Sequence, residues 1–245
     1  MGRRSVSAGA LVAAVAVAAA LPATGRAQTA YFVNPTQISI PGTYIGQATP
    51  YPSSINVSGL SGTVAKASVL LIDVSAGGNI DALDLALVGP SGEKILLWSD
   101  ACGTTGFMDR EFAFDDSAQT FLSNSGACAA DTYLPSNYFD APDDDLSAGG
   151  GPAPPYDNRL SFFNGTSPNG SWSLYAYSDT SADFIRIGAW ELTLDIQPVP
   201  AEAPAPIPTK APQRTGKRAA ALKKCKKKRG KARKKCRRRA KRLPA

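Results

Sequence analysis

The strongest constraint on the fold of this chain is a strict alternation of apolar and polar side chains in several short segments. The pattern is clearest in residues 189–196 and recurs in residues 171–176 and 83–87. The apolar members of the first two segments are Trp190, Leu192, Leu194, Ile196, Trp172, Leu174 and Ala176. A period of two is typical of a β-strand with one buried and one solvated face. We therefore expect strands that place both tryptophans in the core, where each indole N–H needs a hydrogen-bond partner.

Turn-forming sequences separate the expected strands. Gly89-Pro90-Ser91-Gly92 lies between residues 83–88 and 94–98 and predicts a hairpin. Residues 164–170 are rich in Asn and Gly and predict a turn before the strand that contains Trp172. Residues 69–74 are mostly apolar and predict a more fully buried strand. Because no domain segment has helical periodicity beyond a turn or two, the sequence predicts an all-β fold, an antiparallel β-sandwich or jelly roll.

The charges of the 245-residue chain are distributed very unevenly. The net charge is +7, but residues 28–209 contain every acidic side chain and carry −15. Residues 210–245 contain 19 Lys and Arg, with no Asp or Glu. This asymmetry predicts an acidic domain followed by a segment that attracts anionic partners.

The two ends of the domain are marked by composition. Residues 1–27 combine an early Arg pair with a short apolar stretch and small residues, which predicts a signal peptide cleaved after Ala27 and a secreted protein. The β-sandwich is then expected in residues 28–196. Residues 197–213 are rich in proline and predict an extended linker, and residues 214–245 form a Lys/Arg-rich tail.

Four cysteines are compatible with disulfide bonds in a secreted protein. Cys102 and Cys128 both lie in the domain and most simply pair with each other. Cys225 and Cys236 lie eleven residues apart in the tail, about 16 Å along one straight helix. A disulfide bond needs Cα atoms within about 7 Å of each other. The chain must therefore double back, for which Gly230 is suitably placed, or else the bond joins two chains.

The sequence contains no histidine, which excludes several classes of enzyme. Catalytic triads of the Ser-His-Asp and Cys-His types and the common His-ligated zinc sites all require this residue. No other constellation meets the geometric roles of a catalytic site. We therefore expect a protein that is not an enzyme.

Three segments of the domain resemble a known family. They are Ile80–Gly92 with its Gly-Pro-Ser-Gly turn, Phe163–Leu174 with its Pro-Asn-Gly-Ser-Trp-Ser-Leu run, and Gly188–Leu194. In this order and spacing they resemble the P domain (P/Homo B domain) of subtilisin-like proprotein convertases, over about residues 36–196. The resemblance implies a galactose-binding-like jelly roll that normally accompanies and stabilises a serine endopeptidase and influences its calcium dependence. It does not imply that sugar is bound.

Calcium is the cofactor that the acidic domain could hold, because this ion prefers carboxylate and carbonyl oxygens. Asp81, Asp84 and Asp100 lie in or beside stretches that match the P-domain pattern, so they are the first candidate ligands. The alternative is that they are ordinary solvated carboxylates.

The basic tail is expected to be disordered, because dense like charge resists compaction. Its candidate polyanion-binding residues are Lys223, Lys224, Lys226, Lys227, Lys228, Arg229, Lys234, Lys235, Arg237, Arg238 and Arg239. The segment contains no aromatic side chain for base stacking, which favours an anionic envelope polymer over a nucleic acid. Docking of the tail on the acidic domain of the same chain is an alternative.

These features give three functional hypotheses. The first is a non-catalytic, secreted binding or stabilising module that its tail holds at the cell envelope. The second is an accessory component of a serine endopeptidase supplied by a separate chain. The third is a polyanion or nucleic-acid binder in which the sandwich is only a carrier.

Overall fold

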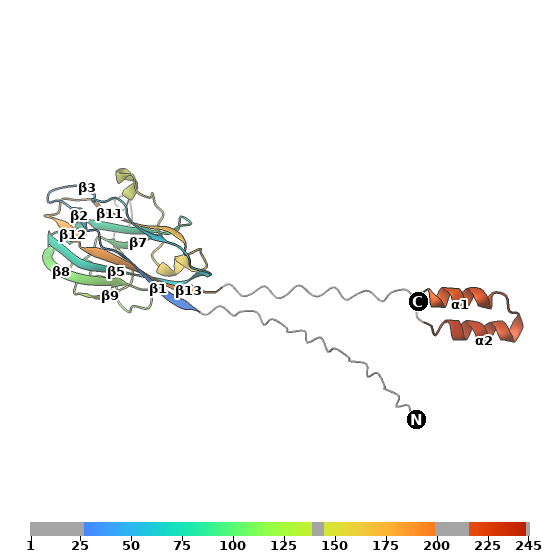
Figure 1. The fold of residues 1–245 in the computed structure, drawn as a ribbon. Coiled ribbons are helices and arrows are strands. Elements are labelled where there is room, and N and C mark those ends of the chain that lie inside the picture. Colours follow the sequence, from blue (N-terminus) through green and yellow to red (C-terminus); the bar gives the residue numbers. More distant parts are fainter. Residues whose placement is uncertain (1–26, 139–144, 199–215, 244–245) are drawn as a thin grey trace, which may run out of the picture. The chain divides into compact units, whose positions relative to one another are not determined.

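A computed structural model describes residues 27–138, 145–198 and 216–243 of the chain. The chain divides into two compact units, Met1–Ala201 and Glu202–Ala245. The first unit contains a β-sandwich and the second a pair of helices (Figure 1). The predicted signal peptide, except its last residue, and most of the predicted linker lie outside the described residues.

The first sheet of the sandwich has seven strands, and its main path runs β1-β13-β5-β12-β2. These strands are β1 (Gln28–Asn34), β13 (Ala189–Gln197), β5 (Thr63–Gly78), β12 (Ile185–Ile187) and β2 (Ile38–Ile40). The long strand β5 also pairs with β8 (Thr105–Phe114), which in turn pairs with β9 (Asp131–Tyr133).

The second sheet has six strands, and its main path runs β10-β7-β6-β11-β3. These strands are β10 (Ser136–Asn137), β7 (Lys94–Ser99), β6 (Leu83–Val88), β11 (Gly170–Ser178) and β3 (Gly46–Gln47), and β4 (Ser53–Val57) also pairs with β11. Short 3-10 helices occur at Ile80–Ala82, Leu146–Gly149 and Leu160–Phe163. The all-β sandwich expected from the sequence is confirmed, but its sheets are mixed rather than purely antiparallel, since β10 pairs with β7 and β9 with β8 in parallel.

The alternating segments form the strands that the sequence predicts. In β11 and β13 the apolar side chains are buried and the intervening ones are mostly half-buried. The predicted hairpin joins β6 to β7 through residues 89–92. The strand predicted at residues 69–74 is present as part of β5, but the prediction that it is more fully buried is wrong: Leu70 and Ile72 are only half-buried, and Asp73 is exposed with φ 53°. Register shifts between β5 and β8 in this region interrupt the regular alternation.

The core between the two sheets is built around large aromatic side chains. Trp98, Trp172 and Trp190 are all fully buried. The indole N–H of Trp172 donates to the carbonyl oxygen of Pro168 at 2.9 Å, and that of Trp190 donates to the Ser53 hydroxyl at 2.9 Å. Both tryptophans therefore have the hydrogen-bond partners that their burial requires.

The second unit corrects the prediction of a disordered tail. Lys217–Cys225 forms helix α1 and Gly230–Ala240 forms helix α2. A disulfide bond joins Cys225 to Cys236 with their Cα atoms 5.6 Å apart, so these cysteines pair within one chain. Gly230 has φ 56°, a left-handed conformation that glycine adopts at little cost, where the chain reverses direction. The covalent link brings the helices together despite their like charge, which is why composition alone gave the wrong expectation.

Candidate functional site

The sandwich carries a group of carboxylates where β6 begins and β7 ends. Asp84 lies in β6 and is only 2% exposed. The Ser99 hydroxyl, at the end of β7, lies 2.8 Å from Oδ1 of Asp84 and 3.1 Å from Oδ2 of Asp100. Asp100 has φ 52°, and this left-handed conformation follows directly on the strand. Two of the three predicted calcium ligands are therefore brought together by one serine.

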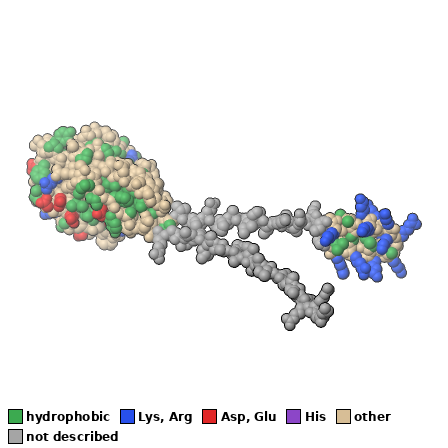
Figure 2. Space-filling view, viewed as in Figure 1, with side chains coloured by type: hydrophobic (Ala, Val, Ile, Leu, Met, Phe, Trp, Pro, Cys, Tyr) green, Lys and Arg blue, Asp and Glu red, His purple; other side chains and the backbone are tan. Residues whose placement is uncertain are grey.

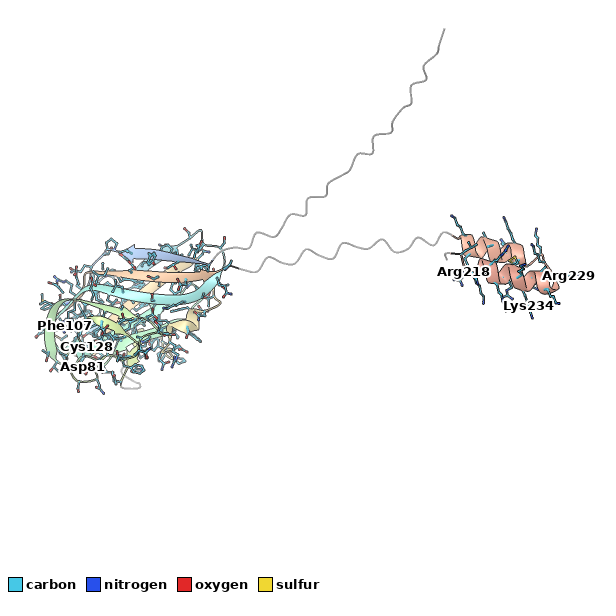
Figure 3. All side chains as sticks on the ribbon, turned by 90° about the horizontal axis from the view of Figure 1, so that it is seen from below. Asp81, Phe107, Cys128, Arg218, Arg229 and Lys234 are labelled. Carbon is cyan, nitrogen blue, oxygen red and sulfur yellow. A yellow bond between two sulfur atoms is a disulfide. The ribbon has the colours of Figure 1, made fainter. Side chains whose placement is uncertain are left out.

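The third predicted ligand, Asp81, lies in the 3-10 helix that precedes β6, at the end of the sandwich where Cys128 also lies (Figure 3). Its backbone N–H donates to the carbonyl oxygen of Gly103 at 3.2 Å. Burial raises the pKa of the Asp81 carboxyl, and the N–H of Gly103 offsets this only in part. In the described part of the chain, Oδ1 of Asp81 is buried and accepts no hydrogen bond.

The three carboxylates do not form one metal-binding cluster. Among the described residues there is no group of three or more His, Cys, Asp or Glu side chains that could hold a metal ion. The donor chemistry of Asp84, Asp100 and the buried oxygen of Asp81 suits calcium, which takes six to eight oxygen ligands. Two further carboxylates, Asp143 and Asp144, lie outside the described residues. Calcium binding therefore stays a prediction.

The loop next to these carboxylates is held by a disulfide bond. Cys102 and Cys128 pair with their Cα atoms 5.0 Å apart, in the pairing expected from the sequence. The bond joins the segment after β7 to the segment before β9, and both sulfur-bearing residues are buried.

The second candidate site is the helical pair, which we call the basic hairpin (residues 216–243). It contains 17 Lys and Arg and no acidic residue. All eleven predicted polyanion-binding side chains lie on α1, on α2 or in the turn between them, and all are exposed. Figure 2 shows these cations around the surface of the hairpin, with apolar side chains between them, and Figure 3 shows Arg218, Arg229 and Lys234 spread along it.

The spacing of alanine and cysteine in the sequence indicates the two helices of this hairpin, whereas the composition does not. Ala221 and Cys225 are four residues apart, as are Ala232, Cys236 and Ala240. Residues spaced in this way share one face of a helix. In the structure Cys225 and Ala240 are buried, Ala221 and Cys236 are half-buried and only Ala232 of the five is exposed, so most of this face is covered in the helix pair.

Comparisons with known proteins give no family for the chain. No protein-family model matches the sequence, and no curated protein matches it. A solved structure of the Aeromonas sobria serine protease in complex with the chaperone ORF2 is similar, with a TM-score of 0.33 and 13% identity over 69% of this chain and 28% of that one. The serine protease of Aeromonas sobria solved separately gives a TM-score of 0.30 and 12% identity over 68% and 27%. The chain thus spans less than a third of these proteins, and at such scores the similarity has no bearing on function.

The α-helices of the described residues, α1 and α2, are nine and eleven residues long. Neither of them has the length and apolar character needed to cross a bilayer.

Proposed function

We propose that this protein is a secreted, non-catalytic binding module whose P-domain-like β-sandwich is held at the cell envelope by the basic hairpin. The observation that carries the proposal is the hairpin itself, in which 17 cationic side chains and no anionic one are held in residues 216–243, eleven of them on the two short helices. A polyanion that binds there releases its counterions and relieves the repulsion between the cations.

The hairpin supports this function better than a flexible tail would. The bond between Cys225 and Cys236 restricts the conformations of the free hairpin, so less entropy is lost on binding. All candidate side chains are exposed, so they reach an extended anionic polymer without rearrangement. The partner that we propose for the hairpin is an anionic polymer of the cell envelope.

The test compares envelope retention of the full mature chain with that of a chain ending at Gln197, the last residue of β13. We expect the full chain to stay bound at low salt and to be released as the ionic strength rises, and the shortened chain to be released throughout. Equal retention of the two forms would show that the hairpin is not the anchor.

A second function, as accessory component of a separate serine endopeptidase chain, is favoured by how the P-domain-like segments meet. β11 pairs with β6, and the ring centroids of Phe163 and Trp172 lie 4.8 Å apart. A Cβ added to Gly170, which has φ 131°, would lie 2.7 Å from Cβ of Pro90, so only glycine fits there. The segments behind the resemblance therefore pack as one unit. Co-purification of a serine endopeptidase with the chain ending at Gln197 tests this function.

A further inference from the structure

A groove runs between the two helices of the basic hairpin. Its volume is about 570 Å³. Six small or apolar residues line it, and we call them the floor: Ala221, Cys225, Ala232, Cys236, Ala240 and Leu243. Four cations also line it, and we call them the rim: Lys224 of α1, Lys228 of the turn between the helices, and Lys235 and Arg239 of α2. The groove therefore combines hydrocarbon surface with four positive charges.

The side chains of the hairpin limit what this groove can recognise. Residues 216–243 consist only of Gly, Lys, Arg, Ala, Leu and Cys. None of these has a hydroxyl, amide, carboxylate or aromatic group. The hairpin thus lacks the acceptors that would read sugar hydroxyls and the rings on which sugars or bases stack. Its chemistry suits a ligand that combines negative charge with hydrocarbon.

We propose that the basic hairpin binds the surface of an anionic phospholipid bilayer through this groove. The rim cations contact lipid phosphates, while their methylene stems and the floor contact the hydrocarbon just below the headgroups. Leu243, which is 41% exposed at the end of the groove, is the floor residue best placed to enter that layer. This lipid proposal rests on the proposed function in one respect, because both require that the hairpin binds anions.

The effect on binding of where the cations lie can be separated from the effect of how many there are. We would measure co-sedimentation of the full mature chain with phosphatidylcholine vesicles that do or do not contain one-third phosphatidylglycerol. Lys228→Gln with Lys235→Gln removes two rim charges, whereas Lys227→Gln with Lys234→Gln removes two exposed charges that do not line the groove. We expect the rim pair to weaken binding to the anionic vesicles by roughly 30-fold, the loss for two cations at a bilayer surface. The matched pair should weaken it by no more than about threefold, because these charges face away from the bilayer.

A second pair of variants tests the contact between the groove floor and the lipid hydrocarbon. Ala232→Gln with Leu243→Gln makes the floor polar without changing the charge, and Ala219→Gln with Ala220→Gln is the matched change at exposed positions outside the groove. At low salt, the floor variant should bind the anionic vesicles more weakly than the wild type, and the matched variant should bind them as the wild type does. Far-ultraviolet circular dichroism of each variant confirms that the helices persist, because glutamine and alanine are both good helix formers.

Inorganic polyphosphate serves as the soluble anion that distinguishes the two proposals. Equal losses in the rim and matched pairs, or binding to polyphosphate without binding to anionic vesicles, would overturn the lipid proposal and leave the envelope anchor standing. Failure to bind either probe would overturn both.

Discussion

At the scale of single residues, Asp81 is a carboxylate in unfavourable surroundings. Its pKa is raised by burial, and its Oδ1 accepts no hydrogen bond from the described residues. A raised carboxyl pKa means that the folded state binds a proton more tightly than the unfolded state. Asp81 therefore lowers stability above its folded pKa, and this penalty disappears as the pH falls to the pKa of the unfolded chain.

The first prediction concerns the removal of this charge. Asp81→Asn should raise the free energy of unfolding at neutral pH without calcium by about 1 kcal/mol, the low end for an unsatisfied polar group, because the site is partly exposed. If Asp81 is a calcium ligand, added calcium should raise the melting temperature of the wild type but not of the variant. Thermal unfolding with calcium and with a chelator measures both effects. Asp131→Asn, at an exposed position in β9, is the control.

The pKa of the Asp115 carboxyl is shifted in the opposite direction, below its ordinary value. Burial alone would raise the pKa of its carboxyl, but hydrogen bonds from Lys66 and Ser117 outweigh burial and hold the pKa below its ordinary value. The Lys66 ammonium lies 2.6 Å from Oδ2 of Asp115. The stability that this group contributes is present above the unfolded pKa and is lost as the pH falls through the lower, folded pKa.

The second prediction follows from that ion pair. Lys66→Gln should lower the free energy of unfolding at pH 7 by about 0.5–1 kcal/mol, a modest value because Lys66 is substantially exposed. The difference from the wild type should shrink below about pH 4 and vanish once Asp115 is protonated in both proteins. Urea unfolding across this pH range checks it, and a pH-independent difference would show that Lys66 acts through packing instead.

At the scale of elements, the basic hairpin is held by one covalent bond against the repulsion of its own charges. Few of its side chains are buried, so its stability does not come from an ordinary apolar core. In the chain-entropy account, a loop of the length closed by Cys225 and Cys236 contributes about 2–3 kcal/mol. Short helices without such support are marginal in water.

The third prediction is that Cys225→Ser with Cys236→Ser abolishes most of the helical circular dichroism of the hairpin at low salt. The far-ultraviolet difference between the full chain and the chain ending at Gln197 isolates this signal. Polyphosphate should restore part of the helix in the variant, because it neutralises the cations. Helices that persist in the variant at low salt would show that packing at the helix contact is sufficient.

The elements also show what could be predicted from sequence. The β6–β7 hairpin, β11 and β13 were predictable because period-two alternation and turn chemistry agree there. β5 was mispredicted at residues 69–74, because register shifts against β8 depend on the partner strand and leave no local signature. The helices α1 and α2 were missed because dense like charge favours disorder in the absence of a covalent link, although the four-residue spacing of alanine and cysteine indicates a helix face.

At the scale of the whole molecule, two units of opposite charge are joined in one chain. The fourth prediction separates an external anchor from docking of the hairpin on the acidic sandwich. If the hairpin serves an external anion, the sandwich should melt at the same temperature in the full chain and in the chain ending at Gln197, even at low salt. A melting temperature that is higher in the full chain, and that falls to that of the shortened chain as salt is added, would favour docking.

The two candidate sites, the basic hairpin and the carboxylates of the sandwich, differ in how much of each could be predicted from the sequence. The cationic residues of the hairpin are visible in the sequence and their role in binding stays a prediction, whereas the groove that four of them line depends on a disulfide pairing that the sequence left open. The meeting of Asp84 and Asp100 through Ser99 required the pairing of β6 with β7. The separate environment of Asp81 depends on burial, which the spacing of the carboxylates does not reveal.

The order of the disulfide bonds along the chain has a consequence for biogenesis. The four cysteines pair in sequence order, the first with the second and the third with the fourth: Cys102 with Cys128 and Cys225 with Cys236. In a chain secreted as proposed above, and oxidised as it emerges amino terminus first, Cys128 and Cys236 each meet their native partner before any further thiol arrives. Oxidative maturation should need a thiol oxidant but no disulfide isomerase, and the native bonds should form with similar yield whether or not an isomerase is present.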